Sequence, residues 1–321
     1  MLITAFLCCS VAVDAQQVDY SVVSVSEESG MEFMKITNSS DYVCMPEVRR
    51  NGDRIDWLSN RILDISTEGK TIAYLSFRNN STNIFLKDLR LQGGSVQRTN
   101  RSAVIDFSYS PDGRYLCFSE MRGDNVQIFQ TDAVNGYACR QITSGANDYS
   151  PVYSADQKQI FFSRMESRGA SVWSYNVDNN FLSSFSSGKN PFPLSTEPAL
   201  VLSRISSNGR SEIWKINYVT GVEECIASDA ERSFTSPIVS PDGRWILFVG
   251  DNSLKVGTDV YRNTDLFACR IDGSAFVQLT YHAADDLSPV WSNDGYFIYF
   301  ISQRGDSAGV ANIWRMTFNV N

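Results

Sequence analysis

The sequence contains a single histidine, His282, among its 321 residues. Metal sites built from several histidines therefore cannot form, and a Ser-His-Asp triad would have to use His282 itself. No glycine-rich phosphate loop and no calcium-loop pattern is present. We therefore expect no metal, no cofactor and no nameable catalytic residue, with His282 as a surface or hydrogen-bonded polar side chain.

Basic charge and long hydrophobic runs are also scarce. The 36 acidic residues outnumber the 28 Lys and Arg residues, which gives a formal net charge of -8. Nucleic acids and anionic membrane surfaces bind basic patches, so we expect neither as a partner. Beyond the N-terminus no stretch approaches the roughly 18 consecutive apolar residues of a membrane span, and we predict no transmembrane segment.

The first fifteen residues differ from the rest of the chain. Residues 2–13 form an apolar run as long as a signal-peptide core, and Val13-Asp14-Ala15 supplies small residues before a cut ahead of Gln16. We predict a signal peptide over residues 1–15 and a periplasmic or outer-membrane-associated location, in a bacterium. A buried first strand is the alternative, because the basic opening of a signal peptide is missing.

Cysteine number and spacing exclude a complete disulfide framework. After removal of the signal peptide, five cysteines remain, at positions 44, 117, 139, 225 and 269. Their number is odd, they are far apart in the sequence, and their spacing is not that of a metal site. We expect them to be small hydrophobic residues within strands.

A repeated turn is the feature that predicts the fold. Ser110-Pro111-Asp112-Gly113 recurs as Ser240-Pro241-Asp242-Gly243 and, with Asn for Pro, at Ser292. Proline presets φ, Asp binds the backbone of its own turn, and Gly takes the positive φ. With weaker copies, the turns begin at residues 66, 110, 154, 240 and 292, in steps of 44, 44, 86 and 52 residues.

A second sequence marker is present within the 86-residue step, where one copy of the turn is missing. An aliphatic-aromatic pair follows each turn on a later strand, and the Trp members predict a packing stripe between neighbouring units. The six copies are Ile84-Phe85, Ile128-Phe129, Val172-Trp173, Ile213-Trp214, Leu266-Phe267 and Ile313-Trp314. Six four-stranded units of 40–50 residues are typical of a β-propeller, with one sheet per blade around a channel.

The sixth unit lacks its fourth strand, which locates the closure of the ring. Glu32–Thr37 stands alone near the N-terminus and resembles the outer strands of other units, so we predict that it completes the last blade. The blades are expected at residues 60–99, 101–143, 145–187, 189–228, 230–280, and 282–317 with 31–37. Residues 16–59 then form the closing strand and a strap, and residues 60–321 form an all-β, six-bladed propeller.

The repeat resembles that of the TolB-like propeller family. Asp148-Tyr149-Ser150-Pro151-Val152-Tyr153-Ser154 and residues 286–292 match its pattern, and the resemblance covers residues 60–321. It implies a periplasmic six-bladed propeller, and the same repeat occurs in the propellers of dipeptidyl-peptidase-like enzymes. The family's separate α/β domain is not expected here, because only about 45 residues lie between the predicted cut and the first blade. The matched residues are structural and imply no particular activity.

Blade geometry indicates where a site would lie. The loop between the second and third strands shares a face with the crossover to the next blade, whereas the Asp-Gly turns lie on the other face. Residues 250–263 predict an enlarged loop on the first of these faces, and residues 41–60 predict a strap near it. The candidate rim residues are Arg49, Arg50, Arg54, Asp148, Arg204, Asp259, Tyr261, Arg262, Asp285 and Asp286. Arg122-Gly123-Asp124 and Arg304-Gly305-Asp306 spell an adhesion tripeptide, but glycine turns are expected there.

Three functions are compatible with this sequence. We favour a non-enzymatic binding or scaffold protein whose partner is a protein, a peptide or a cell-envelope polymer. The alternative is a carbohydrate-active propeller, a lyase or hydrolase, with two of Asp148, Asp259, Asp285 and Asp286 facing across a sugar. The third is a subunit whose partner supplies the chemistry. A deep aromatic pocket would favour the enzyme, and a plugged channel mouth would favour binding.

Overall fold

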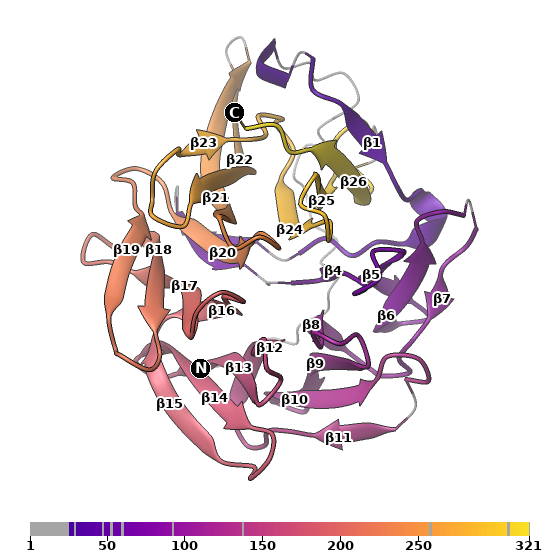
Figure 1. Cartoon of the computed structure of the whole chain (residues 1–321). Helices are drawn as coiled ribbons and strands as arrows, with labels where there is room; N and C mark the ends of the chain where they lie inside the picture. Colours follow the sequence, from indigo (N-terminus) through magenta and orange to yellow (C-terminus); the bar gives the residue numbers. More distant parts are fainter. Residues whose placement is uncertain are drawn as a thin grey trace.

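Six four-stranded antiparallel sheets surround a central channel in the computed structural model, which is the six-bladed propeller that the sequence predicts (Figure 1). The structure describes residues 26–28, 30–46, 48–51, 54–58, 61–91, 93–136, 138–256, 259–306 and 309–320. At residues 26, 49–51, 54–58, 253–256 and 259–261 it describes the backbone alone.

The first three blades follow the chain from the inside of the ring to the outside. Blade 1 consists of β4 (Leu63–Ile65), β5 (Thr71–Arg78), β6 (Ser81–Asp88) and β7 (Val96–Gln97). Blade 2 consists of β8 (Val104–Tyr109), β9 (Tyr115–Arg122), β10 (Asn125–Asp132) and β11 (Cys139–Gln141). Blade 3 consists of β12 (Asn147–Tyr153), β13 (Gln159–Glu166), β14 (Gly169–Asn176) and β15 (Leu182–Ser187).

The last three blades keep this order, including the fourth, whose sequence lacks the Asp-Gly turn. Blade 4 consists of β16 (Lys189–Pro193), β17 (Ala199–Ile205), β18 (Ser211–Asn217) and β19 (Glu223–Ala227). Blade 5 consists of β20 (Phe234–Val239), β21 (Trp245–Val256), β22 (Asp259–Arg270) and β23 (Val277–Gln278). Blade 6 consists of β24 (Asp286–Trp291), β25 (Phe297–Ser302), β26 (Asn312–Thr317) and β1 (Phe33–Lys35).

Three short elements lie outside the blades. Two 3-10 turns, η1 (Ser26–Glu28) and η2 (Ser39–Asp41), flank β1. A two-stranded hairpin, β2 (Val48–Asn51) and β3 (Arg54–Leu58), leads into blade 1. Among the residues that the structure describes, no helix has the length and apolar character needed to cross a bilayer.

The repeated turn is held by its own side chains. Ser110 Oγ donates to Asp112 Oδ1 at 2.7 Å and accepts from the Tyr115 N–H at 2.9 Å, while Gly113 has a φ of 72°. A Cβ on Gly113 would lie 2.6 Å from Oγ1 of Thr67 in the turn of the preceding blade. The glycine therefore serves both the positive φ and the close packing of one turn on the next.

The Ser-Pro pair of the repeat forms a β-bulge on the inner strand. Ser150, Asn190, Ser236 and Ser288 each precede a proline and have φ between 48° and 56°. The pairing of each inner strand shifts at these positions. Proline has no N–H to donate, so a bulge is where it fits inside a sheet.

In blades 1, 2 and 5 a threonine just beyond the outer strand bonds to the third strand. Ile84, Ile128 and Leu266 each donate a backbone N–H to the side chain of Thr99, Thr143 or Thr280, at 2.9–3.1 Å. These aliphatic residues belong to the predicted aliphatic-aromatic pairs. The threonine thus locks the outermost strand to the third strand.

The N-terminal strand closes the ring in the same way. Phe33, Met34 and Lys35 of β1 pair with Met316, Arg315 and Trp314 of β26. Figure 1 shows the indigo β1 beside the yellow β26, so strands from the first and last parts of the described chain lie in one sheet. Thr37 Oγ1 accepts from the Ile313 N–H at 2.8 Å, as the other outer threonines do.

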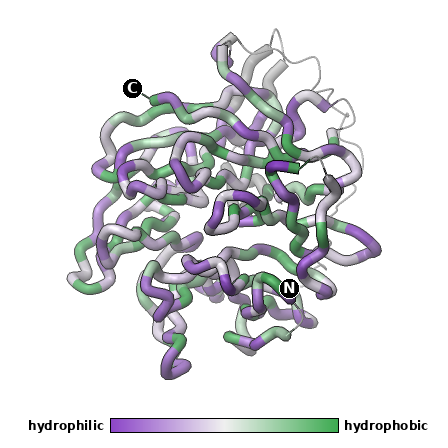
Figure 2. The backbone as a smooth tube through the Cα atoms, turned by 45° about the vertical axis from the view of Figure 1, so that its right-hand side comes forward, coloured by the Kyte–Doolittle hydropathy of each residue, from purple (hydrophilic) through white to green (hydrophobic). Residues whose placement is uncertain are grey.

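Apolar side chains of neighbouring blades fill the spaces between the sheets. Tyr74, Phe107, Phe118 and Ile72 are fully buried in the cluster that joins blades 1, 2 and 6. In Figure 2 hydrophobic and hydrophilic stretches alternate along the tube. Cys117 and Cys269 are buried in this core, and none of the cysteines within the described residues forms a disulfide.

Thr37→Val is expected to weaken closure of the ring. The substitution leaves the buried Ile313 N–H and the Asn312 side chain without their partner, which costs about 1–3 kcal/mol of unfolding free energy. The measurement is the urea midpoint at unchanged slope. The exposed Thr220→Val is the control, and equal midpoints for the two variants would contradict the closing role of Thr37.

Candidate functional site

The two faces of the propeller differ in what they carry. We use "connection face" for the side with the loops between second and third strands and the connections between blades. We use "turn face" for the side with the Asp-Gly turns. Strand direction places the tip of the β21–β22 hairpin on the connection face, together with Asp285 in the connection from blade 5 to blade 6.

The segment expected as an enlarged loop is a hairpin. Residues 251–264 continue the ladder of β21 and β22 from Asp251–Thr264 to Val256–Asp259, and each strand has 12 residues. Beyond Asp251 the described backbone of β21 pairs only with β22. The sequence predicts a loop here, but continued pairing between the two strands keeps both backbones extended past the edge of the blade.

Five of the candidate rim residues lie on the two hairpins, where the description is limited to the backbone. Arg49, Arg50 and Arg54 are on β2 and β3, and Asp259 and Tyr261 are on β22. Their side chains lie outside the described residues. Arg262, which pairs with Ser253, has an exposed side chain.

Asp148 lies inside blade 3 in a buried ion pair. It is fully buried, and its two carboxylate oxygens accept from Nε and a terminal nitrogen of Arg164 at 2.7 and 2.9 Å. The Arg164 guanidinium lies 4.2 Å from the centre of the Trp173 ring. Two parallel charge-assisted bonds orient both groups and leave neither oxygen to a ligand in this arrangement.

Arg204 occupies a similar position in blade 4. Its guanidinium donates to both carboxylate oxygens of Glu223, at 2.8 and 3.1 Å, and to Ser186 Oγ at 2.8 Å. It lies 4.8 Å from the Trp214 ring centre. Hydrogen bonding with Arg204 lowers the pKa of Glu223.

Of the four arginines that stack on the aromatic residue of the pair, only Arg204 is among the rim residues expected from the sequence, and the stacking is not predicted. Arg78 and Arg122 lie over Phe85 and Phe129, as Arg164 and Arg204 lie over their tryptophans. We call these four stacks the arginine belt. The signal was available, because Arg78 and Arg122 each follow the turn serine by 12 residues, as Arg304 does.

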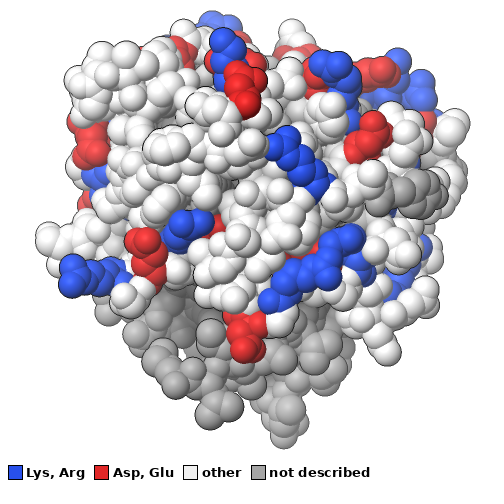
Figure 3. Space-filling view, turned by 90° about the horizontal axis from the view of Figure 1, so that it is seen from below, with Lys and Arg blue, Asp and Glu red and all other residues white. Residues whose placement is uncertain are grey.

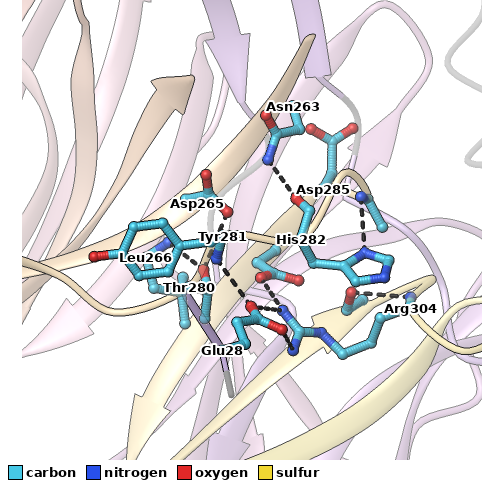
Figure 4. A network of polar contacts seen from close by, with 12 residues as sticks. Glu28, Asn263, Asp265, Leu266, Thr280, Tyr281, His282, Asp285 and Arg304 are labelled. Carbon is cyan, nitrogen blue, oxygen red and sulfur yellow. Dashed lines mark hydrogen bonds and ion pairs between the residues drawn. The ribbon is translucent and has the colours of Figure 1, made fainter. Parts of the chain in front are cut away.

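Asp286 belongs to a cluster that joins three parts of the chain (Figure 4). Arg304 donates to Asp286 Oδ2 at 2.5 Å and to both oxygens of Glu28 at 3.1 and 3.2 Å. Glu28 also accepts the backbone N–H of Tyr281 at 2.9 Å. The Arg304 guanidinium stacks on Phe33 at 4.2 Å, so η1, β1 and blade 6 meet at one buried cation.

Two carboxyl groups of this cluster hold protons more tightly than usual. Burial, reinforced by the nearby charge of Glu28, raises the pKa of Asp286 to about 6 against the opposing effect of Arg304. Burial and Asp286 raise the pKa of Asp265 well above its usual range. Asp265 accepts from Asn252, Gln278 and Thr280 at 2.7–3.3 Å. For Asp286, the effect of burial on the pKa is therefore larger than the opposing effect of the Arg304 guanidinium.

Asp285 and His282 take part in the same connection. Asp285 is half-buried and accepts from Thr264 Oγ1 at 3.0 Å. His282 is buried; its Nδ1 accepts the Ala284 N–H at 3.0 Å, and its carbonyl accepts from Asn263 at 2.6 Å. His282 is therefore a hydrogen-bonded residue inside the rim.

One sequence pattern resembles a catalytic motif, and the elements around it decide whether it has the required structure. Gly305-Asp306-Ser307-Ala308-Gly309 matches the Gly-x-Ser-x-Gly pattern of hydrolase nucleophiles. That motif requires a turn from a strand into a helix. Ser307 and Ala308 lie outside the described residues, and the elements on either side of them, β25 and β26, are antiparallel strands of blade 6. The context does not support a nucleophile.

The central channel is crossed by a side chain. Arg61 lies just before β4, the inner strand of blade 1, and its guanidinium lies 4.8 Å from the ring centre of Phe192 in blade 4. Blades 1 and 4 are opposite in a ring of six, so the side chain spans the channel. Next to it Ser150, Asn190 and Ser236 link three inner strands through their side chains.

Charge on the outer surface is mixed. Figure 3 shows Lys and Arg side chains interspersed with Asp and Glu on the side seen from below. Among the described residues, Arg114 pairs with Asp112 and Arg244 pairs with Asp242 at the surface. A surface of this kind provides no extended field of one sign.

The comparisons with known proteins agree with this architecture. The TolB beta propeller domain family matches residues 63–257, which is more than half of the chain. The chain belongs to the TolB β-propeller family. The match runs from the first strand of blade 1 to the β21–β22 hairpin of blade 5 and so covers the repeats that carry the turn motif.

Solved structures show the same fold at low sequence identity. A protein described as TolB from Agrobacterium tumefaciens is 16% identical, with a TM-score of 0.60 over 83% of this chain and 94% of that one. TolB from Acinetobacter baumannii is 21% identical, with a TM-score of 0.53 over 66% of this chain and 51% of that one. An oligogalacturonate lyase from Vibrio parahaemolyticus is 13% identical, with a TM-score of 0.57 over 90% and 97%.

Arg164→Leu is expected to destabilise this family member strongly. The change leaves the fully buried Asp148 without its cation, and breaking a buried pair from one side costs about 3–5 kcal/mol. Arg114→Leu, which removes an exposed pair, is the control and costs at most about 1 kcal/mol. Denaturant unfolding compares the two. Similar losses would mean that Asp148 does not depend on Arg164.

Stability is expected to respond to pH through Asp286. The pKa of Asp286 is raised in the folded protein, so the protonated side chain stabilises the fold below pH 4. This stabilisation is lost as the pH rises through about 6. Unfolding free energies of the wild type and Asp286→Asn are compared at pH 4.5 and 7. The wild type should lose stability relative to the variant between these values, and a gain would show that the ionised carboxylate is the favoured form.

Proposed function

We propose that this chain is an exported, non-enzymatic binding module whose connection face docks a protein, a peptide or a cell-envelope polymer. The observation that carries the proposal is the β21–β22 hairpin, which extends past its blade with backbone edges that no other described strand covers. Such edges accept an added strand from a partner. The β2–β3 hairpin, which leads into the connection-face end of blade 1, adds a second two-stranded element.

The channel geometry favours docking on the outside over binding deep in the ring. The Arg61 side chain reaches across the channel to Phe192, which narrows the channel at this level for an extended ligand. A partner then meets the rim and the hairpins. The apolar N-terminal run, residues 2–13, supports export of the chain to a periplasmic or outer-membrane-associated location.

A carbohydrate-active function has less support from the described residues. Cleavage of a glycosidic bond needs two available carboxyl groups about 5–10 Å apart across the sugar. Asp148 and Asp286 are buried and paired with Arg164 and Arg304. Asp285 accepts from Thr264, and the Asp259 side chain lies outside the described residues. A partner subunit that supplies chemistry remains compatible with docking through the hairpins.

Shortening the β21–β22 hairpin is expected to abolish partner capture. Residues 253–262 are replaced by Asn-Gly, which joins the paired Asn252 and Asn263 through a two-residue turn. This keeps Asp251, which accepts the Ser233 N–H and supports the blade. Wild type and variant are used to capture partners from the native envelope fraction, and the captured partner is then purified and its affinity measured. We expect at least about a tenfold loss of affinity.

The control carries substitutions on the turn face, at the exposed Val134 and Phe181, each changed to Ser. Thermal unfolding checks that all three proteins keep the propeller. Equal affinity of wild type and shortened variant would mean that the connection-face hairpin is not the site. If none of the proteins captures a partner, the binding function fails, and oligosaccharide cleavage becomes the next assay.

A further inference from the structure

The outer part of blade 6 carries an open groove that the connection-face site does not use. Its volume is about 750 Å³, and it lies between the closing strand and the start of β25. Residues from β1, from the segment just before it, from β26 and from the turn before β25 line it. They include Met31, Phe33, Met34, Tyr296, Phe297 and Arg315. Built ligand sites fall in this range of volume.

Cross-strand register places the groove on one flank of the sheet. Met34 pairs with Arg315, and Arg315 pairs with Tyr299, so the three side chains lie on the same face of blade 6. Tyr299 belongs to the core cluster shared with blade 1. The groove therefore opens where the outer strands of blade 6 face blade 1.

The groove gathers large apolar side chains at the surface. Met31, Met34 and Tyr296 are 39%, 52% and 67% exposed, and they line one cavity. Scattered exposed hydrophobic residues are normal, whereas several around one hollow are typical of a binding surface. Methionine walls adapt their shape to a ligand because the side chain is unbranched and polarizable.

One cation sits among these apolar groups. The Arg315 guanidinium stacks on Phe297, 4.3 Å from the ring centre. Among the described residues no carboxylate lies within ion-pair distance of it, although Glu32 also lines the groove. Arg164, Arg204 and Arg304 on the same propeller all have a carboxylate partner. Arg315 is thus a half-buried cation whose environment is complementary to an anion.

The closing strand supplies a backbone edge beside the groove. β1 is the outermost strand of its sheet, whose order is β1-β26-β25-β24. Its outer edge is not paired with another described strand. An extended peptide can add to such an edge through main-chain hydrogen bonds, while its alternate side chains fill adjacent pockets.

We propose that this groove binds an extended peptide segment that carries a carboxylate. The peptide adds to the edge of β1, its apolar side chains contact Met31 and Met34, and its carboxylate pairs with Arg315. The site is separate from the connection face: Tyr296 belongs to an Asp-Gly turn, so the groove lies toward the turn face. The protein would then hold two partners at once.

The test is an NMR titration of the whole chain with methyl-labelled methionines. The probe is the peptide acetyl-Thr-Val-Glu-Val-Thr-amide, and the matched probe has Lys in place of Glu. We expect the Glu peptide to shift the Met31 and Met34 methyl signals in a saturable way, with about tenfold higher affinity than the Lys peptide. Met31→Leu and Met34→Leu assign the signals. Met121 and Met165, on blades 2 and 3, should not respond.

Variants at Arg315 test whether the preference for the Glu peptide depends on the charge of this side chain. Arg315→Gln should reduce the difference between the two peptides to less than about twofold, and Arg315→Lys should keep it. Thermal unfolding checks that both variants retain the propeller. The proposal is overturned if the two peptides bind wild type equally, if millimolar peptide leaves Met31 and Met34 unchanged, or if sodium hexanoate alone saturates the same shifts at equal concentration.

Discussion

The propeller depends on the pairing of its N-terminal strand with its last blade. The ring closes only if the sixth sheet packs against the first, and β1 supplies the fourth strand of that sixth sheet. Loop-closure entropy opposes joining residues nearly 280 positions apart, so the contact needs specific bonds. Thr37 supplies one of them, and Arg304 adds another by holding Glu28 and Phe33.

Buried charge has a structural role in much of this molecule. Arg122, Arg164 and Arg304 each lie over an aromatic ring and pair with a buried carboxylate, whereas Arg204 pairs with the more exposed Glu223. A guanidinium suits this position because its flat face stacks while its edge donates hydrogen bonds. The consequence is that Asp148, Arg204 and Asp286, which look like site residues in the sequence, also hold blades together.

Function then depends on what the blades leave uncovered. Among the described residues, the features that extend beyond the blades or open between them include the two hairpins of the connection face and the groove beside β1. These features offer backbone edges and adaptable apolar surface, which suit association with extended chains. The fold shared with TolB and with an oligogalacturonate lyase is a scaffold that carries different sites.

The sequence by itself determined the number of blades, their bounds to within a few residues and the strand that closes the ring. It could do so because turns and strand pairs are local signals, repeated every 44 residues or so, and errors in one copy are corrected by the next. The tertiary structure decided which charged residues remain available. Asp148 and Arg164 are 16 positions apart, and Glu28 and Arg304 are 276 apart, so no local pattern reveals that each pair is buried. The groove at Arg315 likewise exists only because a strand from the other end of the chain forms its wall.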